Sequence, residues 1–309
     1  MDKIFDCLIL GGGPAGYSAA LYLGRAGYTS LVLERFMAGG QMTETTEIDN
    51  YPGFDETVDG FTLGAKMQSG AEKFGAKTIQ TEISEAKLSG DVKEIKTADG
   101  TFYGKTVIVA TGAAHRHLGL PNEEELAGKG VGYCATCDGM FYRGKTVMVI
   151  GGGNSAASDA AYLSKICEKV YLVHRRDVLR AEKYYKDALT KVSNVEFIFD
   201  STLEEFIFDD KIKGGKIKNV KSGEISEISA DGIFISIGRS PNTELFKDEL
   251  TMDSSGYITA DESTKTNIPG VFAAGDVRTK PFRQIVTAAS DGANAAHSIE
   301  EYFMNKLQH

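Results

Sequence analysis

One pattern of strand, glycine-rich loop and helix occurs twice in this 309-residue sequence. The apolar residues 4–10 lead into GGGPAG at 11–16, and residues 145–150 lead into GGGNSA at 151–156. Each loop precedes an alanine-rich segment with helical periodicity and then a further apolar strand. A strand, a helix and a strand in this order form a βαβ unit, whose two strands are parallel. The sequence therefore predicts an α/β fold with two nucleotide-binding units.

The spacing of the glycines suits a turn that holds a pyrophosphate. The first glycine permits the tight turn, the second lets the backbone approach the phosphates, and the third small residue lets helix and strand pack closely. The helix N-terminus then offers N–H donors and a partial positive charge. One such loop is weak evidence, whereas two in matching surroundings are strong. The three positions are Gly11, Gly13 and Gly16 in the first loop and Gly151, Gly153 and Ala156 in the second.

The two units differ where the adenosine ribose of a dinucleotide would lie. In the first unit this position is Glu34, whose carboxylate can accept hydrogen bonds from a ribose 2′-hydroxyl. In the second unit it is His174, and a basic cluster follows. Arginine side chains can grip a 2′-phosphate that a carboxylate would repel, which indicates NADPH in the second unit. The arginines are Arg175, Arg176 and Arg180.

Length and composition agree with two globular domains. Domains usually hold roughly 100–200 residues, so 309 residues leave little room for a third. No apolar run approaches the roughly 18 residues of a membrane helix, and we expect no membrane partner. The first strand runs into a glycine loop instead of a cleavage site, which predicts a cytoplasmic protein. With a net charge of −9 and no basic tract, we expect no nucleic-acid partner.

Only two of the four cysteines lie close together, in YCATCDG at 133–139. Four scattered cysteines are too few for the disulfide framework of a secreted domain. A zinc site would need further ligands at suitable spacing, so we predict no metal. Cysteines in a CxxC motif often have lowered pKa values, which makes Cys134 and Cys137 candidates for redox chemistry. Cys7 and Cys167 are expected to be core residues.

Eight motifs carry a resemblance to a known family. In chain order they are GGGPAG, AGGQ (38–41), ATG (110–112), YCATCDG, GGGNSA, HRRD with Arg180, GVFAAGDV (270–277) and RQ (283–284). With these motifs the sequence resembles the bacterial-type, low-molecular-weight thioredoxin reductases, which are NADPH-dependent flavoproteins, over essentially the whole chain. The resemblance implies two Rossmann-like domains of three ββα layers, with the NADPH domain inserted into the FAD domain. The FAD domain would comprise 1–113 and 244–309, and the NADPH domain, with the CxxC motif, 114–243.

The resemblance also implies which residues hold the cofactors. Those expected to hold FAD are Gly11, Gly13, Pro14, Ala15, Gly16, Glu34, Gly40, Gln41, Asn50, Gly112, Asp276, Arg283, Gln284 and Ile285. Those expected to hold NADPH are Gly151, Gly153, Asn154, Ser155, Ala156, His174, Arg175, Arg176 and Arg180. Among the FAD residues, Asp276 would bind the ribityl chain and Arg283 to Ile285 would lie beside the flavin. Some members of the family have no acid where this chain has Glu34, which changes a detail of ribose binding but not the reaction.

By the same resemblance, the dithiol receives electrons from NADPH through FAD and passes them to thioredoxin. Cys137 would face the flavin, Cys134 would attack the partner protein, and Asp138 would manage the thiol proton as acid and base. The dithiol and NADPH belong to one domain and FAD to the other. We therefore expect the inserted domain to rotate between half-reactions about its two connections, near 112–118 and near 239–246, where Gly119, Gly238 and Pro241 break regular structure. The family is usually homodimeric.

Several alternatives stay open at this point. A glutaredoxin-like protein or another small dithiol protein would present the same chemistry as thioredoxin. A related flavoprotein without disulfide exchange, such as a ferredoxin–NADP reductase relative, would not need YCATCDG. A ferredoxin-driven thioredoxin reductase would not need HRRD and Arg180. A non-catalytic flavin and NADPH redox sensor would carry both nucleotide sites without turnover.

Overall fold

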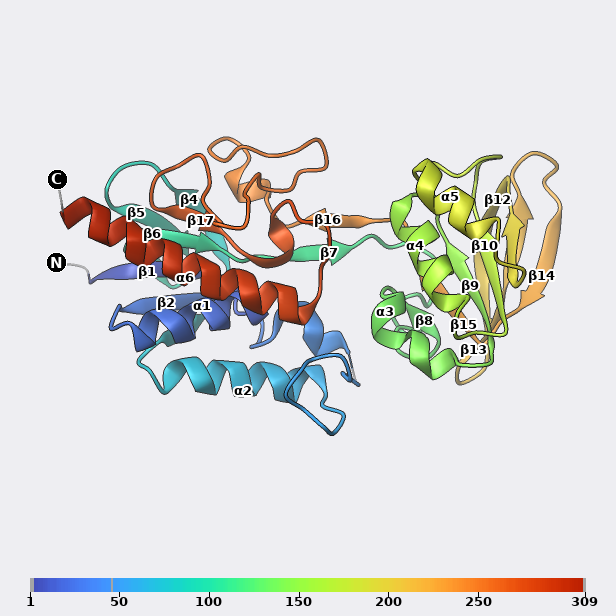
Figure 1. The fold of residues 1–309 in the computed structure, drawn as a ribbon, viewed down its shortest axis with the longest axis horizontal. Helices are drawn as coiled ribbons and strands as arrows, with labels where there is room; N and C mark the ends of the chain where they lie inside the picture. Colours follow the sequence, from blue (N-terminus) through green and yellow to red (C-terminus); the bar gives the residue numbers. More distant parts are fainter. Residues whose placement is uncertain (1–2, 46, 308–309) are drawn as a thin grey trace. The chain divides into compact units, whose positions relative to one another are not determined.

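The computed structural model describes residues 3–45 and 47–307. They form two compact units. One contains the described residues up to Ala114 and from Ser240 onward, and the other is His115–Arg239. The second unit is therefore inserted into the first (Figure 1).

The second unit ends at Arg239, and the next residues already belong to the first unit. Asn242 then bonds the first unit through both its backbone and its side chain. Its N–H donates to the Gly112 carbonyl at 3.0 Å, and its side-chain amide donates to the Thr111 carbonyl at 2.8 Å. These bonds attach the returning chain to the segment that follows β6.

The first unit contains a seven-stranded sheet. Before the insertion its elements are β1 (Ile4–Leu10), α1 (Pro14–Arg25), β2 (Ser30–Glu34), the 3-10 helix η1 (Gly40–Glu44), α2 (Gly60–Glu72), β3 (Lys77–Gln80), β4 (Ile83–Lys87), β5 (Lys93–Thr97) and β6 (Gly100–Val109). After it come the 3-10 helix η3 (Glu244–Phe246), β17 (Val271–Ala273), the 3-10 helix η4 (Gly275–Val277) and α6 (Ile285–Leu307). The strand order is β3-β2-β1-β6-β5-β4, with β17 also paired to β6.

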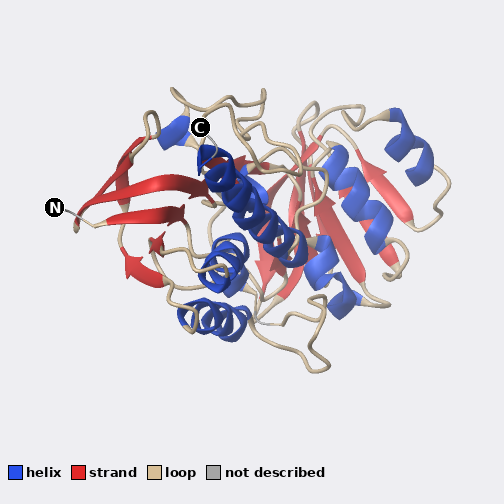
Figure 2. Cartoon of the chain, turned by 60° about the vertical axis from the view of Figure 1, so that its left-hand side comes forward, coloured by secondary structure: helices blue, strands red, loops and turns tan. Residues whose placement is uncertain are grey.

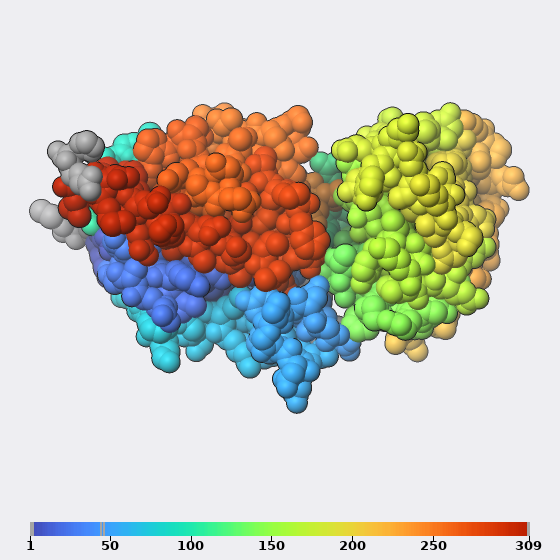
Figure 3. Space-filling view, in the orientation of Figure 1, coloured from blue at the N-terminus to red at the C-terminus, as the bar shows by residue number. Residues whose placement is uncertain are grey.

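Side chains alternate between the two faces of the sheet along β1, and on both faces those from Cys7 to Leu10 are apolar and covered. Cys7 and Ile9 face a core that contains residues of α1 and α6, which lie side by side (Figure 1). Leu8 and Leu10 face a second core, which includes Ile95 of β5. A parallel sheet buried on both faces has nearly continuous apolar strands, as IFDCLIL does. The outer side of α6, drawn in red, is visible along the surface of this unit in Figure 3.

The second unit repeats the arrangement. Its elements are β8 (Val131–Gly132), α3 (Ala135–Asp138), the 3-10 helix η2 (Gly139–Tyr142), β9 (Thr146–Ile150), α4 (Asn154–Leu163), β10 (Lys169–Val173), α5 (Lys183–Leu189), β11 (Val195–Ile198), β12 (Ser201–Phe208), β13 (Ile212–Asn219), β14 (Ile225–Ser229) and β15 (Gly232–Ile235). The parallel sheet has the order β11-β10-β9-β15-β8, and β12-β13-β14 form an antiparallel sheet. Figure 2 shows helices and strands in separate layers within each unit.

The two connections between the units pair with each other. β7 (Ala113–His115) and β16 (Arg239–Pro241) form a two-stranded sheet. Next to it, the Arg116 N–H donates to the Gly238 carbonyl at 3.1 Å. Across residues 3–45 and 47–307, no helix has both the length and the apolar character that a membrane span requires.

Candidate functional site: a dithiol and two dinucleotide loops

Cys134 and Cys137 form a disulfide with their Cα atoms 5.3 Å apart. Cys134 follows β8 and lies directly before α3, the short helix that carries Cys137. The backbone N–H groups of Cys137 and Asp138 both donate to the Cys134 carbonyl at 3.1 Å, which holds the loop in a tight turn. Both cysteines are only half-buried, so an external reagent can reach this pair.

The other two cysteines are unsuited to the same chemistry. Cys7 and Cys167 are buried and carry free thiols. Burial raises the pKa of Cys7 to about 12 and that of Cys167 to about 11. Because the thiolate is the reactive form, both stay inert near neutral pH.

Asp138 ends α3 and turns back toward β8. Its Oδ2 lies 3.2 Å from the position that a Cβ on Gly132 would take. Burial raises the pKa of Asp138 from 3.8 to about 6. A carboxyl group that titrates there can hold a proton and release it near neutral pH, which is what a thiol–disulfide cycle requires of an acid and base.

The first glycine loop is shaped by close backbone contacts. A Cβ on Gly11 would lie 2.4 Å from the Ala110 carbonyl oxygen, and a Cβ on Gly16 would lie 2.0 Å from that of Gly11. At Gly13 the nearest non-neighbouring atom, the Gly39 oxygen, would be 3.9 Å away. The fold therefore requires glycine at the first and third positions, whereas the second leaves space that a ligand can occupy.

The residues after this loop bring α1 and α6 together. Pro14 opens α1, where its fixed φ and missing N–H are tolerated. A Cβ on Gly292 would lie 2.1 Å from the Ala15 carbonyl oxygen, and a Cβ on Gly275 would lie 3.0 Å from the Ala15 side chain. The turn that carries Asp276 is thereby packed against the start of α1.

Glu34 holds the first loop to the end of β2. Its Oε2 accepts the Gly12 N–H at 2.5 Å and its Oε1 accepts the Phe36 N–H at 3.0 Å. The side chain is buried. Each carboxylate oxygen has a second lone pair, so Glu34 can still accept a bond from a ribose hydroxyl. The sequence did not reveal the contact with Gly12, which depends on how the glycine loop returns beside the end of β2. The bond to Phe36 is a local contact, two residues further along the chain.

Other FAD candidates meet around the same loop. A Cβ on Gly40, the first residue of η1, would lie 3.5 Å from the Gly13 Cα. Gln41 follows in η1. The Asn50 amide donates to the Gln284 side-chain oxygen at 3.1 Å, although 234 residues separate them. The structure thus gathers candidates from three parts of the chain in one unit.

The guanidinium of Arg283 holds the turn that carries Asp276. It donates to the Asp276 carbonyl at 3.3 Å and lies over the Tyr257 ring at 4.0 Å from its centre. Ile285 begins α6 directly afterwards. Gly112, after β6, has open space where its Cβ would be.

The second glycine loop has the same construction as the first. A Cβ on Gly151 would lie 2.3 Å from the Ser236 carbonyl oxygen, whereas a Cβ on Gly153 would meet nothing within 4 Å. Asn154 starts α4 and exchanges hydrogen bonds of 3.0 and 2.8 Å with Glu182. The next residues of α4 are the exposed Ser155 and the buried Ala156.

The basic segment after β10 folds back onto this loop. The Arg180 N–H donates to the Gly152 carbonyl at 2.7 Å. His174 is buried below Gly152, and no described residue bonds its Nε2. Burial, together with Arg180 and the other arginines, lowers the pKa of His174, so the positive charge here belongs to the arginines alone. The two further arginines, both exposed, are Arg175 and Arg176.

Comparison with known proteins identifies the family. The model for pyridine nucleotide-disulphide oxidoreductases matches residues 5–292. The thioredoxin reductase of Listeria monocytogenes is 45% identical over 97% of this chain and 94% of the relative, and that of Streptomyces coelicolor is 45% identical over 98% and 95%. The chain belongs to the thioredoxin reductases. The enzyme is an oxidoreductase that uses FAD and NADPH.

Solved structures support the same assignment. The crystal structure of thioredoxin reductase from Streptococcus pyogenes MGAS5005 matches with a TM-score of 0.92 at 42% identity, over 99% of this chain and 100% of that one. A thioredoxin reductase from Giardia duodenalis gives a TM-score of 0.92 at 34% identity, over 98% and 100%. The predicted fold, two Rossmann-like nucleotide-binding domains, is confirmed.

Sequence analysis missed Glu123, which supports Tyr133, the residue before Cys134. The carboxylate is 3% exposed and accepts the Tyr133 hydroxyl at 2.9 Å. It also accepts the backbone N–H groups of Leu118 and Gly119 at 3.0 and 2.8 Å. Glu123 stands in the run NEEEL, where only burial distinguishes it from its exposed neighbours, and the sequence holds no signal for that burial.

Proposed function

We propose that this thioredoxin reductase carries electrons from NADPH to oxidised thioredoxin by way of the Cys134–Cys137 disulfide. FAD, when bound, accepts a hydride from NADPH and supplies two electrons to a neighbouring disulfide. One observation carries the proposal. A half-buried CxxC disulfide lies on a nucleotide-binding unit, and the adjacent Asp138 has a pKa of about 6.

The first unit supports an FAD site. Its loop is closed by backbone contacts at Gly11 and Gly16 but open at Gly13, and α1 begins there without a side-chain cap, so its first N–H groups can meet a phosphate. Gly112 also leaves space for a ligand. We assign FAD to these residues and to Pro14, Ala15, Glu34, Gly40, Gln41, Asn50, Asp276, Arg283, Gln284 and Ile285.

The second unit supports an NADPH site. Gly153 leaves open space at the loop, and no described residue bonds the buried Nε2 of His174. A buried polar atom is costly unless it is bonded, and a bound nucleotide would supply a partner. We assign the 2′-phosphate to Arg175, Arg176 and Arg180, and the remaining contacts to Gly151, Asn154, Ser155, Ala156 and His174.

Disulfide exchange then follows from the chain's own groups. In the reduced enzyme the Cys134 thiolate attacks one sulfur of the partner's disulfide, forms a mixed disulfide and displaces the other sulfur as a thiolate. The Cys137 thiolate attacks Cys134, restores the enzyme disulfide and releases the partner as a dithiol. The partner gains two electrons and two protons. Asp138 receives and returns the proton of the thiol next to it.

We further propose that the inserted unit rotates between the two half-reactions. Its two connections are the short paired strands β7 and β16, through which the chain enters and leaves the inserted unit. Gly238, with φ of +103°, lies beside this pair and can absorb a backbone change that other residues would resist. Chemical cross-linking of the two units should stop turnover, and full turnover after cross-linking would rule out rotation.

We assign thioredoxin as the partner protein. We also propose that the enzyme is a homodimer and that it lies in the cytoplasm. The relatives at 45% identity include thioredoxin reductases, and the cytoplasm is the compartment in which thiols are kept reduced. The alternatives are a glutaredoxin-like partner and a redox sensor without turnover.

Steady-state oxidation of NADPH by the purified protein tests the proposal. Continuous oxidation should require a thioredoxin disulfide, and NADH should be a poor substitute for NADPH. Continuous oxidation with a glutaredoxin disulfide but not with thioredoxin would establish the alternative partner. A sensor would oxidise at most one equivalent of NADPH, whatever disulfide protein is added.

A further inference from the structure

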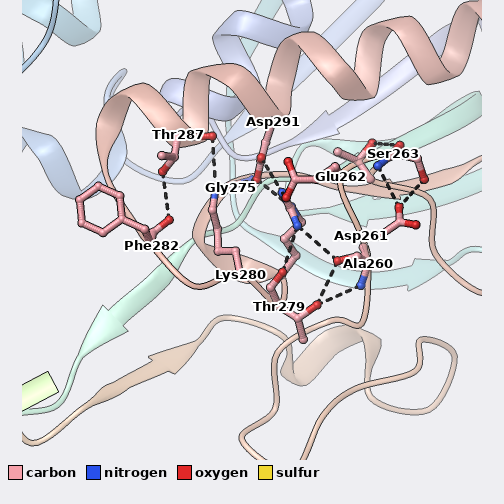
Figure 4. A network of polar contacts seen from close by, with 12 residues as sticks. Ala260, Asp261, Glu262, Ser263, Gly275, Thr279, Lys280, Phe282, Thr287 and Asp291 are labelled. Atoms are coloured by element: carbon pink, nitrogen blue, oxygen red, sulfur yellow. Dashed lines mark hydrogen bonds and ion pairs between the residues drawn. The ribbon is translucent and has the colours of Figure 1, made fainter. Parts of the chain in front are cut away.

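A buried carboxylate on α6, Asp291, bonds the turn that carries Asp276. Its Oδ2 accepts the Gly275 N–H at 2.8 Å and the Arg278 Nε at 2.8 Å, and its Oδ1 accepts the Arg278 Nη2 at 2.7 Å. Lys280 donates to Oδ2 at 2.9 Å. Figure 4 shows Asp291 pointing from the helix toward Gly275 and Lys280. The Asp291 side chain is 3% exposed, so solvent does not weaken these bonds.

The two cations of this network are buried as well. The side chains of Arg278 and Lys280 are 2% and 4% exposed. Arg278 also donates to the Ala260 carbonyl at 3.3 Å and to Glu262 at 3.0 Å, and Lys280 donates to the Thr287 carbonyl at 3.2 Å. Glu262 is exposed, so Asp291 is the buried anion among these contacts.

Asp291 is ionised at neutral pH. Burial by itself would raise its pKa, but hydrogen bonds from Arg278 and Lys280 hold the pKa below its usual value. Removing the Asp291 charge would leave two cations facing each other without their buried counter-ion. Breaking one partner of a buried network in this way is costly, whereas the intact network contributes little net stability compared with apolar packing. A network of this kind is therefore better suited to fixing a geometry than to stabilising the fold.

The network around Asp291 fixes the backbone geometry of the turn 275–280. Gly275 has φ of +81°, and its N–H is the group that Asp291 accepts. From the other side, Arg283 donates to the carbonyls of Arg278 and Lys280, both at 3.1 Å. The turn is thus held at its first N–H by Asp291 and at its later carbonyls by Arg283.

We propose that Asp291 is a positioning residue that keeps Gly275 and Asp276 in the conformation that binds FAD. The inference rests on the proposed function, which assigns Asp276 to FAD. Removing the Asp291 charge should therefore weaken FAD binding. A substitution elsewhere in the same unit that lowers fold stability by the same amount should weaken FAD binding less.

Three variants test this. Asp291→Asn removes the charge. Arg278→Met removes two bonds to Asp291 but leaves the balanced pair of Asp291 and Lys280, so it can fold if Asp291→Asn does not. The matched control is Lys93→Met, because Lys93 is a buried cation of the same unit that bonds the Gly90 and Pro269 carbonyls, away from the turn.

The measurement is release of FAD from the purified holoenzyme, followed as free-flavin fluorescence after dilution, together with the thermal midpoint. We expect release to be about tenfold faster in Asp291→Asn and about threefold faster in Arg278→Met, because a charged hydrogen bond to the turn is lost. Lys93→Met should lower the thermal midpoint but change release by less than about twofold.

If Asp291→Asn and Arg278→Met release FAD no faster than Lys93→Met at a similar thermal midpoint, Asp291 is only a structural residue and the inference is overturned. If Asp291→Asn does not fold, the rate of FAD release from Arg278→Met is compared with that from Lys93→Met, and this comparison tests the inference. A wild-type protein that holds no FAD would overturn the proposed function and this inference together. FAD held equally well by wild type and variants would overturn this inference alone.

Discussion

Asp138 lies against Gly132, with its Oδ2 3.2 Å from the place where a Cβ on Gly132 would be. This burial raises the pKa of Asp138 from 3.8 to about 6. Because the folded protein binds the proton more tightly than the unfolded chain does, wild type should lose stability as pH rises through this window. The difference between the two pKa values corresponds to at most about 3 kcal/mol.

Asp138→Asn should therefore unfold at a higher urea concentration than wild type at pH 7, and the two proteins should converge below pH 4. Its turnover with thioredoxin should fall by about 10²-fold, because a positioned acid and base typically contributes at least that much. Urea unfolding at several pH values and steady-state rates measure both effects. A variant with wild-type turnover would remove Asp138 from the proton path.

Cys134→Ser and Cys137→Ser should each lower thioredoxin reduction by about 10³-fold or more, because the exchange needs both sulfurs. The matched control is Cys167→Ala, which alters a buried thiol whose pKa of about 11 keeps it unreactive. That variant should retain turnover. Rates with saturating NADPH and thioredoxin give the comparison. Unimpaired reduction by either serine variant would end the dithiol mechanism.

Alanine at Gly16 should destabilise the fold, whereas alanine at Gly13 should weaken FAD binding without destabilising the fold. The Gly16→Ala Cβ would lie 2.0 Å from the Gly11 carbonyl oxygen, so the backbone must shift. We expect this variant to lose about 2–3 kcal/mol of unfolding free energy. Gly13→Ala has room for its methyl group and should unfold like wild type, yet release FAD faster because the methyl group occupies the ligand's space. Equal FAD retention in Gly13→Ala and wild type would argue against a pyrophosphate at this loop.

Replacing Arg175 and Arg176 by alanine should change the choice of nicotinamide cofactor. Each arginine can form charge-assisted bonds to the 2′-phosphate, so KM for NADPH should rise by about tenfold per residue. NADH lacks this phosphate, and its KM should stay the same. Raised salt should weaken NADPH binding to wild type more than to the double variant. An equal loss for both cofactors would mean that the arginines support the fold instead of reading the phosphate.

Glu34 illustrates what a local pattern can and cannot predict. Its place at the end of β2 followed from strand spacing, and the structure has it there. Its bond to Gly12 did not follow, since it depends on how the glycine loop returns beside the end of β2. Its contact with ribose stays a prediction, as do the cofactor roles of the other candidate residues.

The sequence by itself determined the repeated βαβ units, the two glycine loops and the CxxC pair. These features are local, because strand periodicity, tight turns and a three-residue cysteine spacing depend on neighbouring residues alone. Only the tertiary structure decided that Asn242 bonds Gly112, that Glu123 supports Tyr133, and that Asp291 holds Gly275. These pairs join segments that only the folded chain brings together, and a carboxylate reveals its role only when burial removes water and leaves a particular set of donors around it.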